Sequence, residues 1–488
     1  MKLPIMMLFD IYGFYYAYDS ITNNYVKISK EAYDFFKEAK LHTKIGEEIS
    51  NEIINKYEEG YNLVKMLIEK NNILNGFDFG QPKYWYNKEN IKDLLENKSK
   101  VLVLEVTKKC NFRCKYCCWS DTYYEKDCYA NKDMSIDIIK KSLDNFLNYS
   151  KDSENIAISF YGGEPLIAFN NIKFVVDYIN KNVKTKKHHY NFTTNLYLLD
   201  ETILDFLYNN NFHLLVSLDG PQWIHDAGRI TINNSGTYEK IFNNLMMIKN
   251  KYPVYFKNNI SFNAVIPQLK YKDYVINFFV EKFPENRFMF SDLSPGYNIE
   301  KINEYFQILN KNKLFYKIKD LKKEEKISER YYLGLVDSTK ERIKLSVYDD
   351  ALAPYFKNID IKLKNNGYFW NNGCCILGQR KMFVDVNGNI FPCEKVDINN
   401  EKYLIGNVSD GYNYKKIDKI INDFSSLIQK CNKCWAIVHC HMCWKFLYSN
   451  IDKCKTYRSE VYFRIKKAIT ILEFNPKLVK EFDKIKIK

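Results

Sequence analysis

The chain has 488 residues, of which 46% are hydrophobic and 16% aromatic, and its formal net charge at pH 7 is +14. This hydrophobic content excludes a largely disordered protein, and the length suffices for two or three globular domains of roughly 100 to 200 residues each. No apolar run approaches the roughly 18 to 20 residues of a membrane-spanning helix. The apolar run at residues 3–9 ends at Asp10 without a following small-residue cleavage site, so we expect a soluble cytoplasmic protein without a membrane partner.

The excess of positive charge lies beyond residue 95 and is spread over a sequence rich in Lys, Asn, Ile and Tyr. It contains no block of five or six basic residues, and scattered lysines are typical of a solvated surface. The charge is compatible with an anionic partner, but its pattern does not indicate a nucleic-acid-binding protein.

The 13 cysteines form two groups, separated by residues 129–373, which contain none. The cytosol keeps thiols reduced, so metal ligation explains these groups better than a disulfide framework does. The first group is Cys110, Cys114, Cys117, Cys118 and Cys128. The second group is Cys374, Cys375, Cys393, Cys431, Cys434, Cys440, Cys443 and Cys454.

Residues 6–29 alternate aromatic or β-branched residues around a polar turn at 20–24, which predicts a β-hairpin. Ser29 is placed to cap a helix with four apolar residues at helical spacing. These are Ala32, Phe35, Phe36 and Ala39, and a second series follows at Ile53, Ile54, Tyr57, Tyr61, Val64 and Leu67. A hairpin followed by helices predicts a winged-helix-like module that ends near residues 80–82. The alternative is an N-terminal extension packed on the main domain.

From residue 101 onward, strand-like runs alternate with amphipathic helices. Six runs predict strands, at residues 101–106, 156–160, 190–193, 214–218, 260–265 and 287–290. Between the first two, Ser135 is placed to cap a helix with Ile136, Ile139, Leu143, Phe146 and Leu147 on one face. This alternation predicts an α/β fold with a parallel sheet, open or barrel-like. Residues 300–370 look helical, and the weak periodicity after residue 371 favours a small metal-organised domain.

Cys110, Cys114 and Cys117 form a CxxxCxxC motif directly after the first predicted strand, at the strand end where parallel α/β proteins build their sites. Three thiolates can hold three irons of a 4Fe-4S cluster and leave the fourth open, whereas a structural zinc site uses four ligands. The motif resembles that of the radical S-adenosylmethionine (SAM) superfamily, whose fold is a partial (β/α)6 barrel. The resemblance implies that the open iron binds SAM and that a 5'-deoxyadenosyl radical takes hydrogen from substrate.

The ends of the later strands also resemble this superfamily. Residues 162–165 match its GGEP motif; glycines let the backbone approach a ligand, and a carboxylate accepts from an ammonium group. By resemblance, this segment binds the amino group of SAM, and an aromatic residue of the cysteine motif flanks the adenine. Later strand ends are similar to positions near the ribose and the carboxylate. The expected SAM-binding residues are Tyr116, Gly162, Gly163, Glu164, Pro165, Asn195, Ser217 and Arg229.

The second cysteine group resembles the SPASM pattern of peptide and protein maturases. The resemblance includes Cys375, a GxxxxC segment ending at Cys393 and the run from Cys431, although only two residues separate Cys440 from Cys443. By resemblance, one auxiliary 4Fe-4S cluster is held by Cys431, Cys434, Cys440 and Cys454. The other cluster is held by Cys393 and Cys443 with Cys374 or Cys375 or both. One of its irons is open if the two adjacent cysteines cannot both reach the cluster. Two zinc sites are the alternative, because CxxC pairs suit zinc.

Three polar residues accompany this second group. His439 and His441 lie among the cysteines, and we expect them to hydrogen-bond near cluster sulfur rather than to replace a thiolate. Glu394 directly follows Cys393. Related sulfatase maturases carry a carboxylate here that takes a substrate proton, so the resemblance makes Glu394 a candidate catalytic base. The alternative is a surface or salt-bridged glutamate.

The N-terminal module looks like the precursor-recognition element of ribosomal peptide maturases, in which a leader peptide pairs with a strand edge and tethers the core peptide. Together, the resemblances imply a radical SAM/SPASM peptide maturase that forms Cys thioether crosslinks and uses a reductant such as flavodoxin or ferredoxin. The expected domains are a recognition module (1–95), the radical SAM core (96–295), a bridging region (296–370), the SPASM domain (371–460) and a helical tail (461–488).

Four other functions compete with this interpretation. A sulfatase-maturase-like enzyme would oxidise Cys or Ser to formylglycine, but a short sulfatase motif needs no leader-binding module. A related maturase would join two side chains through a carbon–carbon bond. A zinc or iron-sulfur electron carrier has no reason to keep CxxxCxxC together with GGEP. A nucleic-acid-modifying radical enzyme fits the charge, whereas the SPASM pattern indicates polypeptide substrates.

Overall fold

The structure is a computed structural model that describes residues 1–76, 88–120, 122, 129–293, 297–315, 375, 377–440, 442–445 and 454–474. This described part of the chain forms two compact units. The first unit holds the described residues of 1–88 and 418–488 together with Cys375, and the second holds those of 89–347 and 376–417. Within these ranges, no helix is long and apolar enough to cross a membrane.

The second unit is built on a sheet whose six central strands are parallel and lie side by side in chain order. These strands are β4 (Val101–Thr107), β5 (Asn155–Gly162), β6 (Lys187–Thr194), β7 (His213–Ser217), β8 (Ile260–Ile266) and β9 (Arg287–Asp292). All six strands predicted from the sequence are therefore confirmed, as is the parallel α/β fold. Because the strands are parallel, their carboxyl ends meet at one edge of the sheet.

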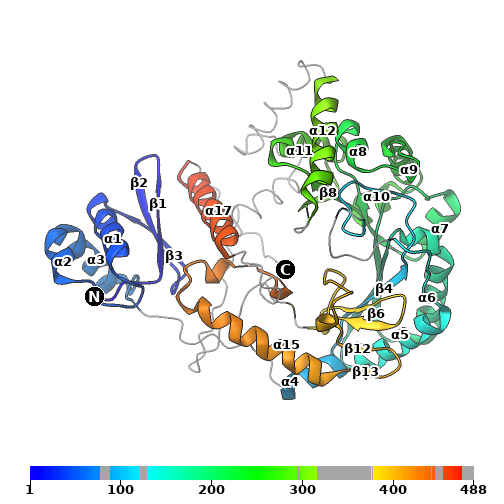
Figure 1. The fold of residues 1–488 in the computed structure, drawn as a ribbon, viewed down its shortest axis with the longest axis horizontal. Helices are drawn as coiled ribbons and strands as arrows, with labels where there is room; N and C mark the ends of the chain where they lie inside the picture. The colour runs from blue at the N-terminus through cyan, green and yellow to red at the C-terminus, as the bar shows by residue number, and fades with distance from the viewer. Residues whose placement is uncertain are drawn as a thin grey trace. The chain divides into compact units, whose positions relative to one another are not determined.

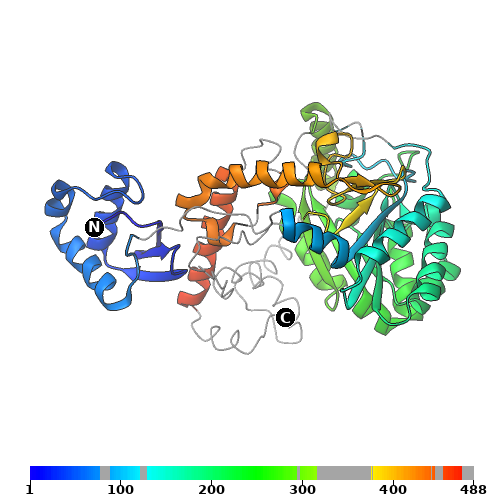
Figure 2. The same ribbon diagram turned by 90° about the horizontal axis from the view of Figure 1, so that it is seen from below.

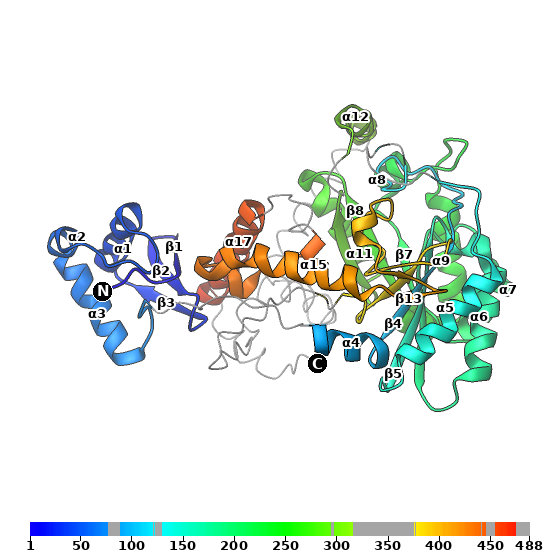
Figure 3. The same ribbon diagram turned by 60° about the horizontal axis from the view of Figure 1, so that its bottom comes forward.

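Helices connect successive strands, and most of them lie along one face of this sheet (Figures 1 and 3). They are α5 (Ile136–Tyr149), α6 (Phe169–Asn182), α7 (Glu201–Asn209), α8 (Gln222–Gly228), α9 (Tyr238–Lys251), α10 (Pro253–Asn259) and α11 (Lys272–Lys282), with α4 (Lys88–Asn97) before the sheet and α12 (Ile299–Phe315) after it. Ser135 caps α5 as predicted, since its side chain accepts from Ile138 N at 3.3 Å. Ile139, Leu143 and Phe146 are buried, but Ile136 in the first turn is exposed.

Four short strands from the predicted SPASM range extend the same sheet. β10 (Met382–Val384) pairs in parallel with β4, and β11 (Asn389–Phe391), β12 (Gly406–Asn407) and β13 (Gly411–Tyr412) follow in antiparallel order. The Asp385 carboxylate closes the β10–β11 turn by accepting from Asn387 N and Asn389 N, both at 2.8 Å. Strands of two or three residues are too short to show alternation, which is why the sequence did not predict them.

The first unit begins with a three-stranded antiparallel sheet instead of the single predicted hairpin. Its strands are β1 (Met6–Ile11), β2 (Phe14–Asp19) and β3 (Asn24–Ile28). The extra turn lies at Tyr12 and Gly13, which both have positive φ, +47° and +86°. Such a two-residue turn favours a tight hairpin. Tyr12 is an unusual residue for this conformation, which is why the turn was not predicted.

Three helices follow this sheet. They are α1 (Lys30–His42), α2 (Asn51–Lys56) and α3 (Glu58–Asn71). Ser29 caps α1 by accepting from Ala32 N at 3.2 Å, and the four predicted apolar residues of this helix are buried. The second predicted helical series is interrupted at Tyr57, which leaves helical geometry between α2 and α3.

Both faces of the three-stranded sheet are buried. One face packs on the helices α1 to α3. The other packs on the long helix α17 (Cys454–Phe474) and on the turns η5 (Ile428–Lys433) and η6 (Ile437–His439), which follow α15 (Tyr414–Leu427). In Figures 1 and 2 the blue helices and the red α17 lie on opposite sides of the blue strands. Residues near the two ends of the sequence thus share one core.

Candidate active site and cluster-binding loops

The CxxxCxxC motif lies in the loop that follows β4. Two backbone hydrogen bonds hold this loop against the segment after α8. Arg113 N donates to Ile230 O at 2.8 Å, and Lys115 N donates to Gly228 O at 2.9 Å. The three cysteines are therefore fixed at the carboxyl edge of the parallel sheet, where their sequence position predicts them to lie.

The thiols of Cys110, Cys114 and Cys117 lie close together, because the charges of Cys117 and Cys110 both act on the Cys114 thiol. Burial raises the pKa of Cys110 to about 12, with the charges of Glu164 and Cys117 adding to the rise. Burial also raises the pKa of Cys114, and Arg229 opposes that rise. A metal centre reverses this tendency, because it binds thiolates and deprotonates them. Among the described residues, no three His, Cys, Asp or Glu side chains are arranged to bind one metal ion. An iron-sulfur cluster has a different requirement, because each thiolate binds a separate iron.

The two glycines of the GGEP segment let the end of β5 lie directly against the cysteine loop. Gly162 has φ +139°, and a Cβ there would lie 1.9 Å from the carbonyl oxygen of Thr107. A Cβ on Gly163 would lie 2.2 Å from the carbonyl oxygen of Lys109. Gly163 N donates to Thr107 O at 3.0 Å, and Glu164 N donates to Lys109 O at 2.8 Å. Only glycine permits this approach of two backbones.

Glu164 is buried and connects the ends of β5 and β6. One of its oxygens accepts from Leu166 N at 3.1 Å and from Thr194 Oγ1 at 2.7 Å, and the other accepts from Asn195 N at 2.7 Å. Burial raises the pKa of Glu164 to about 7, and these hydrogen bonds oppose the rise. Pro165 opens the following turn η1 (Pro165–Ala168), which Glu164 caps. Both carboxylate oxygens accept from the chain itself, so contact with the amino group of SAM stays a prediction.

Several buried polar atoms have no hydrogen-bond partner among the described residues, and two of them belong to Asn111 and Gln268, which follow β4 and β8 at the carboxyl edge of the sheet. Asn195 Nδ2 donates to Asn111 Oδ1 at 2.8 Å, which fixes Asn111 beside Cys110. Asn111 Nδ2 is then left unpaired, and so is Gln268 Oε1 after β8. Leaving a buried polar group unpaired costs about 1–3 kcal/mol. A donor and an acceptor of this kind fit the carboxylate, amino and hydroxyl groups of SAM.

Asp219, directly after Leu218 at the end of β7, is the centre of a buried ion pair, although it was not among the expected SAM-binding residues. It accepts from Arg229 Nε at 3.0 Å and Nη2 at 3.2 Å, from Val265 N at 2.9 Å, and from the Tyr116 hydroxyl. Burial disfavours the charge of Arg229, but the Asp219 carboxylate keeps its pKa well above the usual range. The guanidinium carbon lies 5.4 Å from the centre of the Tyr116 ring. The structure thus brings together two of the predicted residues, Tyr116 and Arg229. The signal for Asp219 in the sequence was its position directly after the predicted strand at residues 214–218.

Ser217, another predicted SAM-binding residue, is buried at the end of β7. The nearby His225 is fully buried and neutral. Its Nδ1 accepts from Asp219 N at 3.3 Å, and its Nε2 lies 3.0 Å from Thr237 Oγ1. The Thr237 hydroxyl donates to Arg229 O at 2.8 Å, so Nε2 carries the proton and donates to Thr237. Burial lowers the pKa of His225 to about 3.

Glu394, the predicted base, lies in the same unit as the CxxxCxxC loop, in the turn after β11. Its Oε1 accepts from Lys381 Nζ at 2.6 Å, and its Oε2 is buried without a hydrogen-bond partner among the described residues. After burial, the nearby charges of Cys118 and Glu394 are the main reasons that the pKa of Tyr161 is raised. Tyr161 directly precedes the GGEP segment, so Glu394 lies near the carboxyl edge of β5. Lys381 is a partner that the sequence did not reveal.

Four cysteines of the second group gather in the first unit. Burial raises the pKa of Cys431 to about 12 and that of Cys440 to about 11, and Cys434 and Cys454 add to both rises. Cys434 N donates to Cys431 O at 3.0 Å, which places this CxxC pair on one turn. Arg458 hydrogen-bonds Cys434 and lowers its pKa against the effect of burial. These are the four cysteines expected to hold one auxiliary cluster, and their chemistry fits that group.

The predicted ligands of the other auxiliary cluster are divided between the two units, and one of them lies outside the described residues. Cys374, like Cys128 and His441, lies outside the described residues. Cys375 and Cys443 belong to the first unit and Cys393 to the second. This ligand set therefore stays a prediction.

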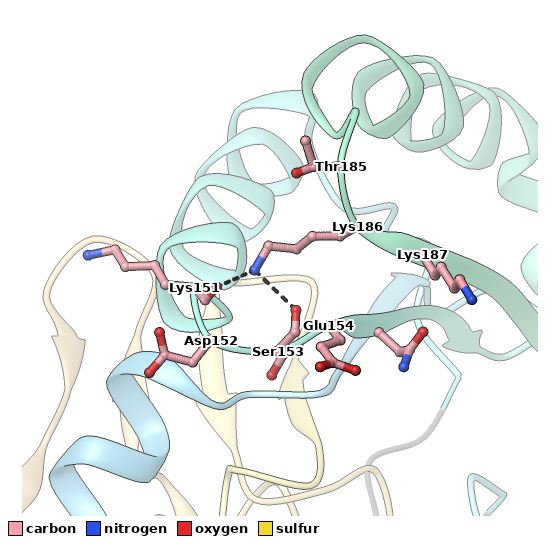
Figure 4. A pocket seen from close by; sticks show the side chains of 8 residues that line it. Lys151, Asp152, Ser153, Glu154, Thr185, Lys186 and Lys187 are labelled. Carbon is pink, nitrogen blue, oxygen red and sulfur yellow. Dashed lines mark hydrogen bonds between the residues drawn. The ribbon is translucent and has the colours of Figure 1, made fainter.

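A surface hollow of about 370 Å³ lies at the opposite edge of the sheet, near the starts of β5 and β6. Its lining comes from residues 151–155 and 185–187, and Figure 4 shows the Lys186 ammonium turned toward the neighbouring loop. Lys186 Nζ donates to Lys151 O at 2.6 Å and to Ser153 O at 3.2 Å. The hollow contains none of the predicted site residues.

Comparisons with known proteins identify the class. Residues 104–275 match the model of the Radical SAM superfamily. A cysteine-type anaerobic sulfatase-maturating enzyme of Clostridium novyi is 23% identical over 68% of this chain and 84% of its own length. The radical SAM cyclopropyl synthase TigE of Paramaledivibacter caminithermalis is 26% identical over 62% of this chain and 61% of its own length. The solved structure of native anSMEcpe with bound AdoMet and Cp18Cys peptide has a TM-score of 0.55 and 19% identity, covering 79% of this chain and 99% of that chain.

The domain match and the site geometry together define a radical SAM enzyme related to the anaerobic sulfatase maturases. SAM and a 4Fe-4S cluster are its cofactors, and the partial-barrel fold is the one predicted. Cys110, Cys114 and Cys117 lie within the matched range, and their role as ligands of the SAM-binding cluster stays a prediction. The cysteine-rich C-terminal part is consistent with auxiliary clusters.

Proposed function

We propose that this enzyme modifies a ribosomally made precursor peptide by forming a thioether between a Cys sulfur and a carbon of another residue. The observation that carries the proposal is the sheet of the first unit. Its edge strand β3 pairs with β2 alone among the described strands. An extended leader peptide can add to such an edge through main-chain hydrogen bonds, while alternate side chains provide specificity.

The extent of the chain leaves room for a dedicated recognition module. The match to anSMEcpe covers nearly all of that chain but leaves about a fifth of this one without a counterpart. A leader bound by an additional module raises the effective concentration of the core peptide at the active site. A short sulfatase motif would not need this arrangement.

The proposed reaction removes one hydrogen from a substrate C–H group and one from the Cys thiol, and a C–S bond forms. When bound, SAM and the clusters supply a radical that takes the hydrogen atom from carbon and an acceptor for the remaining electron. The thiol proton goes to a base. Glu394 is the candidate, because Lys381 holds its Oε1 while its buried Oε2 has no partner among the described residues.

Formylglycine formation is the second candidate function, favoured by the position of Glu394 and by the relatives named as anaerobic sulfatase-maturating enzymes. A carboxylate that takes a proton suits both reactions, so Glu394 alone does not separate them. The relative named cyclopropyl synthase keeps carbon–carbon bond formation as a further alternative.

Mass spectrometry of the products separates the three reactions. The anaerobically reconstituted enzyme is incubated with short Cys-containing peptides encoded beside its gene and, separately, with a peptide carrying a sulfatase-type Cys motif. We expect the first substrate to lose two hydrogens and its Cys to resist alkylation. A two-hydrogen loss with an alkylatable Cys would indicate a carbon–carbon link. Loss of sulfur with gain of a hydrazine-reactive aldehyde would establish formylglycine formation.

A further inference from the structure

The N-terminal sheet and the Cys431–Cys440 segment form one structural element, although the sequence separates them by some 400 residues. The buried face of the sheet contributes Met7, Phe9, Ile11, Tyr16 and Tyr18 to a cluster that also contains Ala436 and four residues of α17. Ile5 packs with Ile437 and Val438, and Ile21 contacts the same cluster as Cys431 and Cys434. The loop that carries three predicted cluster ligands is therefore built on the sheet that would bind the leader.

Two hydrogen bonds connect the β2–β3 hairpin to this loop. The Tyr25 hydroxyl on edge strand β3 lies 2.8 Å from Nε2 of His439, which directly precedes Cys440. The Ser20 hydroxyl, fully buried at the end of β2, donates to Trp435 O at 2.6 Å, next to Cys434. Tyr18 stacks on Tyr25, with ring centres 4.8 Å apart, and contacts the His439 ring in a tilted arrangement, with ring centres 5.2 Å apart.

We propose that Tyr25 and Ser20 are positioning residues of the auxiliary cluster, so that cluster assembly and occupation of the β3 edge affect each other. The inference rests on the proposed function and on the ligand set Cys431, Cys434, Cys440 and Cys454. A peptide strand added to β3 would face Tyr25 across the new strand pair and restrict its side chain. Tyr25 in turn holds the residue that precedes a cluster ligand.

Thermodynamic linkage makes this coupling reciprocal. If a bound peptide changes the equilibrium of the cluster loop, the assembled cluster must change the affinity of the β3 edge by the same factor. Hydrogen bonds and dipoles beside the ligands also tune a cluster's reduction potential. The coupling can therefore be measured from the cluster side, before the precursor is known, with iron and sulfide as the probe.

The first measurement is amide hydrogen exchange of the full-length protein before and after reconstitution with iron and sulfide. We expect residues 24–28 of β3 to exchange at least about fivefold more slowly when the clusters are present. In Tyr25→Phe and in Ser20→Ala, this additional protection is reduced, while α1 on the other face keeps its protection. Tyr15→Phe is the matched control, because Tyr15 lies on β2 and packs toward α1 beside Tyr33.

The second measurement is the midpoint potential of the auxiliary cluster, followed by electron paramagnetic resonance. We expect Tyr25→Phe to shift it and Tyr15→Phe to leave it unchanged. Wild-type-like exchange and potentials in both Tyr25→Phe and Ser20→Ala, with full iron content, would overturn the inference. If either variant loses iron while Tyr15→Phe does not, the positioning role is supported directly.

Failure of the proposed function gives a different result. An enzyme that makes formylglycine, or that has no leader peptide, would still show the exchange and potential changes of the two variants. A protein that holds no auxiliary iron would instead refute the ligand set, independently of Tyr25.

Discussion

The two cysteine-rich regions are held in place in different ways. The CxxxCxxC loop is anchored by neighbours within its own unit, at the ends of β5 and β7 and in the segment after α8. The Cys431–Cys440 loop is instead anchored by the first 25 residues of the chain, through contacts such as Ser20 with Trp435. The first arrangement suits a centre shared by a superfamily, whereas the second would connect the predicted auxiliary centre to the proposed recognition module.

The largest effect is expected from Cys114→Ala. Its thiol is buried and lies close to those of Cys110 and Cys117, so its loss should remove the SAM-binding cluster and reduce SAM cleavage to background. The measurement is 5'-deoxyadenosine formation under reducing, anaerobic conditions. Cys118→Ala is the matched control, since Cys118 has no place in the motif and should retain cleavage. Equal loss of SAM cleavage in both variants would contradict the prediction that Cys114 is a cluster ligand and Cys118 is not.

Cys434→Ala should separate SAM cleavage from product formation. The variant keeps the second unit intact, so some uncoupled cleavage should continue while peptide modification is lost. Iron content should fall from about twelve to about eight atoms per chain, because one of three 4Fe-4S clusters is removed. Unchanged iron content, or loss of SAM cleavage equal to that of Cys114→Ala, would contradict this division of labour.

Lys381→Met should slow peptide modification about tenfold, equivalent to ~1.4 kcal/mol of barrier, and leave SAM cleavage nearly unchanged. The reason is that Glu394 Oε1 loses the ammonium that holds it at 2.6 Å. Lys381→Arg preserves the charge and should recover most of the rate. A Met variant that modifies peptide normally would show that the ion pair does not position Glu394.

His225 should make the second unit less stable at acidic pH. Its pKa is about 3 in the folded protein and about 6.5 when exposed. Since the folded pKa is the lower one, the stabilisation is fully present above pH 6.5 and declines as the pH falls. Between pH 7 and pH 5 the loss is about 2 kcal/mol. Urea unfolding of the protein and of His225→Gln tests this: the variant should lack that part of the pH dependence.

The sequence predicted the six parallel strands, the capped helices α1 and α5 and the carboxyl-edge position of the CxxxCxxC loop, because those features depend on local periodicity and adjacent residues. It did not predict β10 to β13, whose strands are too short to show a period. Nor did it predict the partners Lys381 of Glu394 and Tyr25 of His439. Those contacts depend on how segments that are distant in the sequence pack together, and no residue spacing within the sequence indicates that packing.

The parallel pairing of β10 with β4 also has a consequence for synthesis on the ribosome. Met382 pairs with Leu102, so the strand that leads into the CxxxCxxC loop lacks one neighbour until 280 more residues have been made. At about 5–20 residues per second this interval lasts about 15–55 s. We expect the nascent chain to expose an unpaired strand edge next to three thiols throughout that time, which makes translation speed and oxygen exposure joint determinants of how much active enzyme a cell obtains.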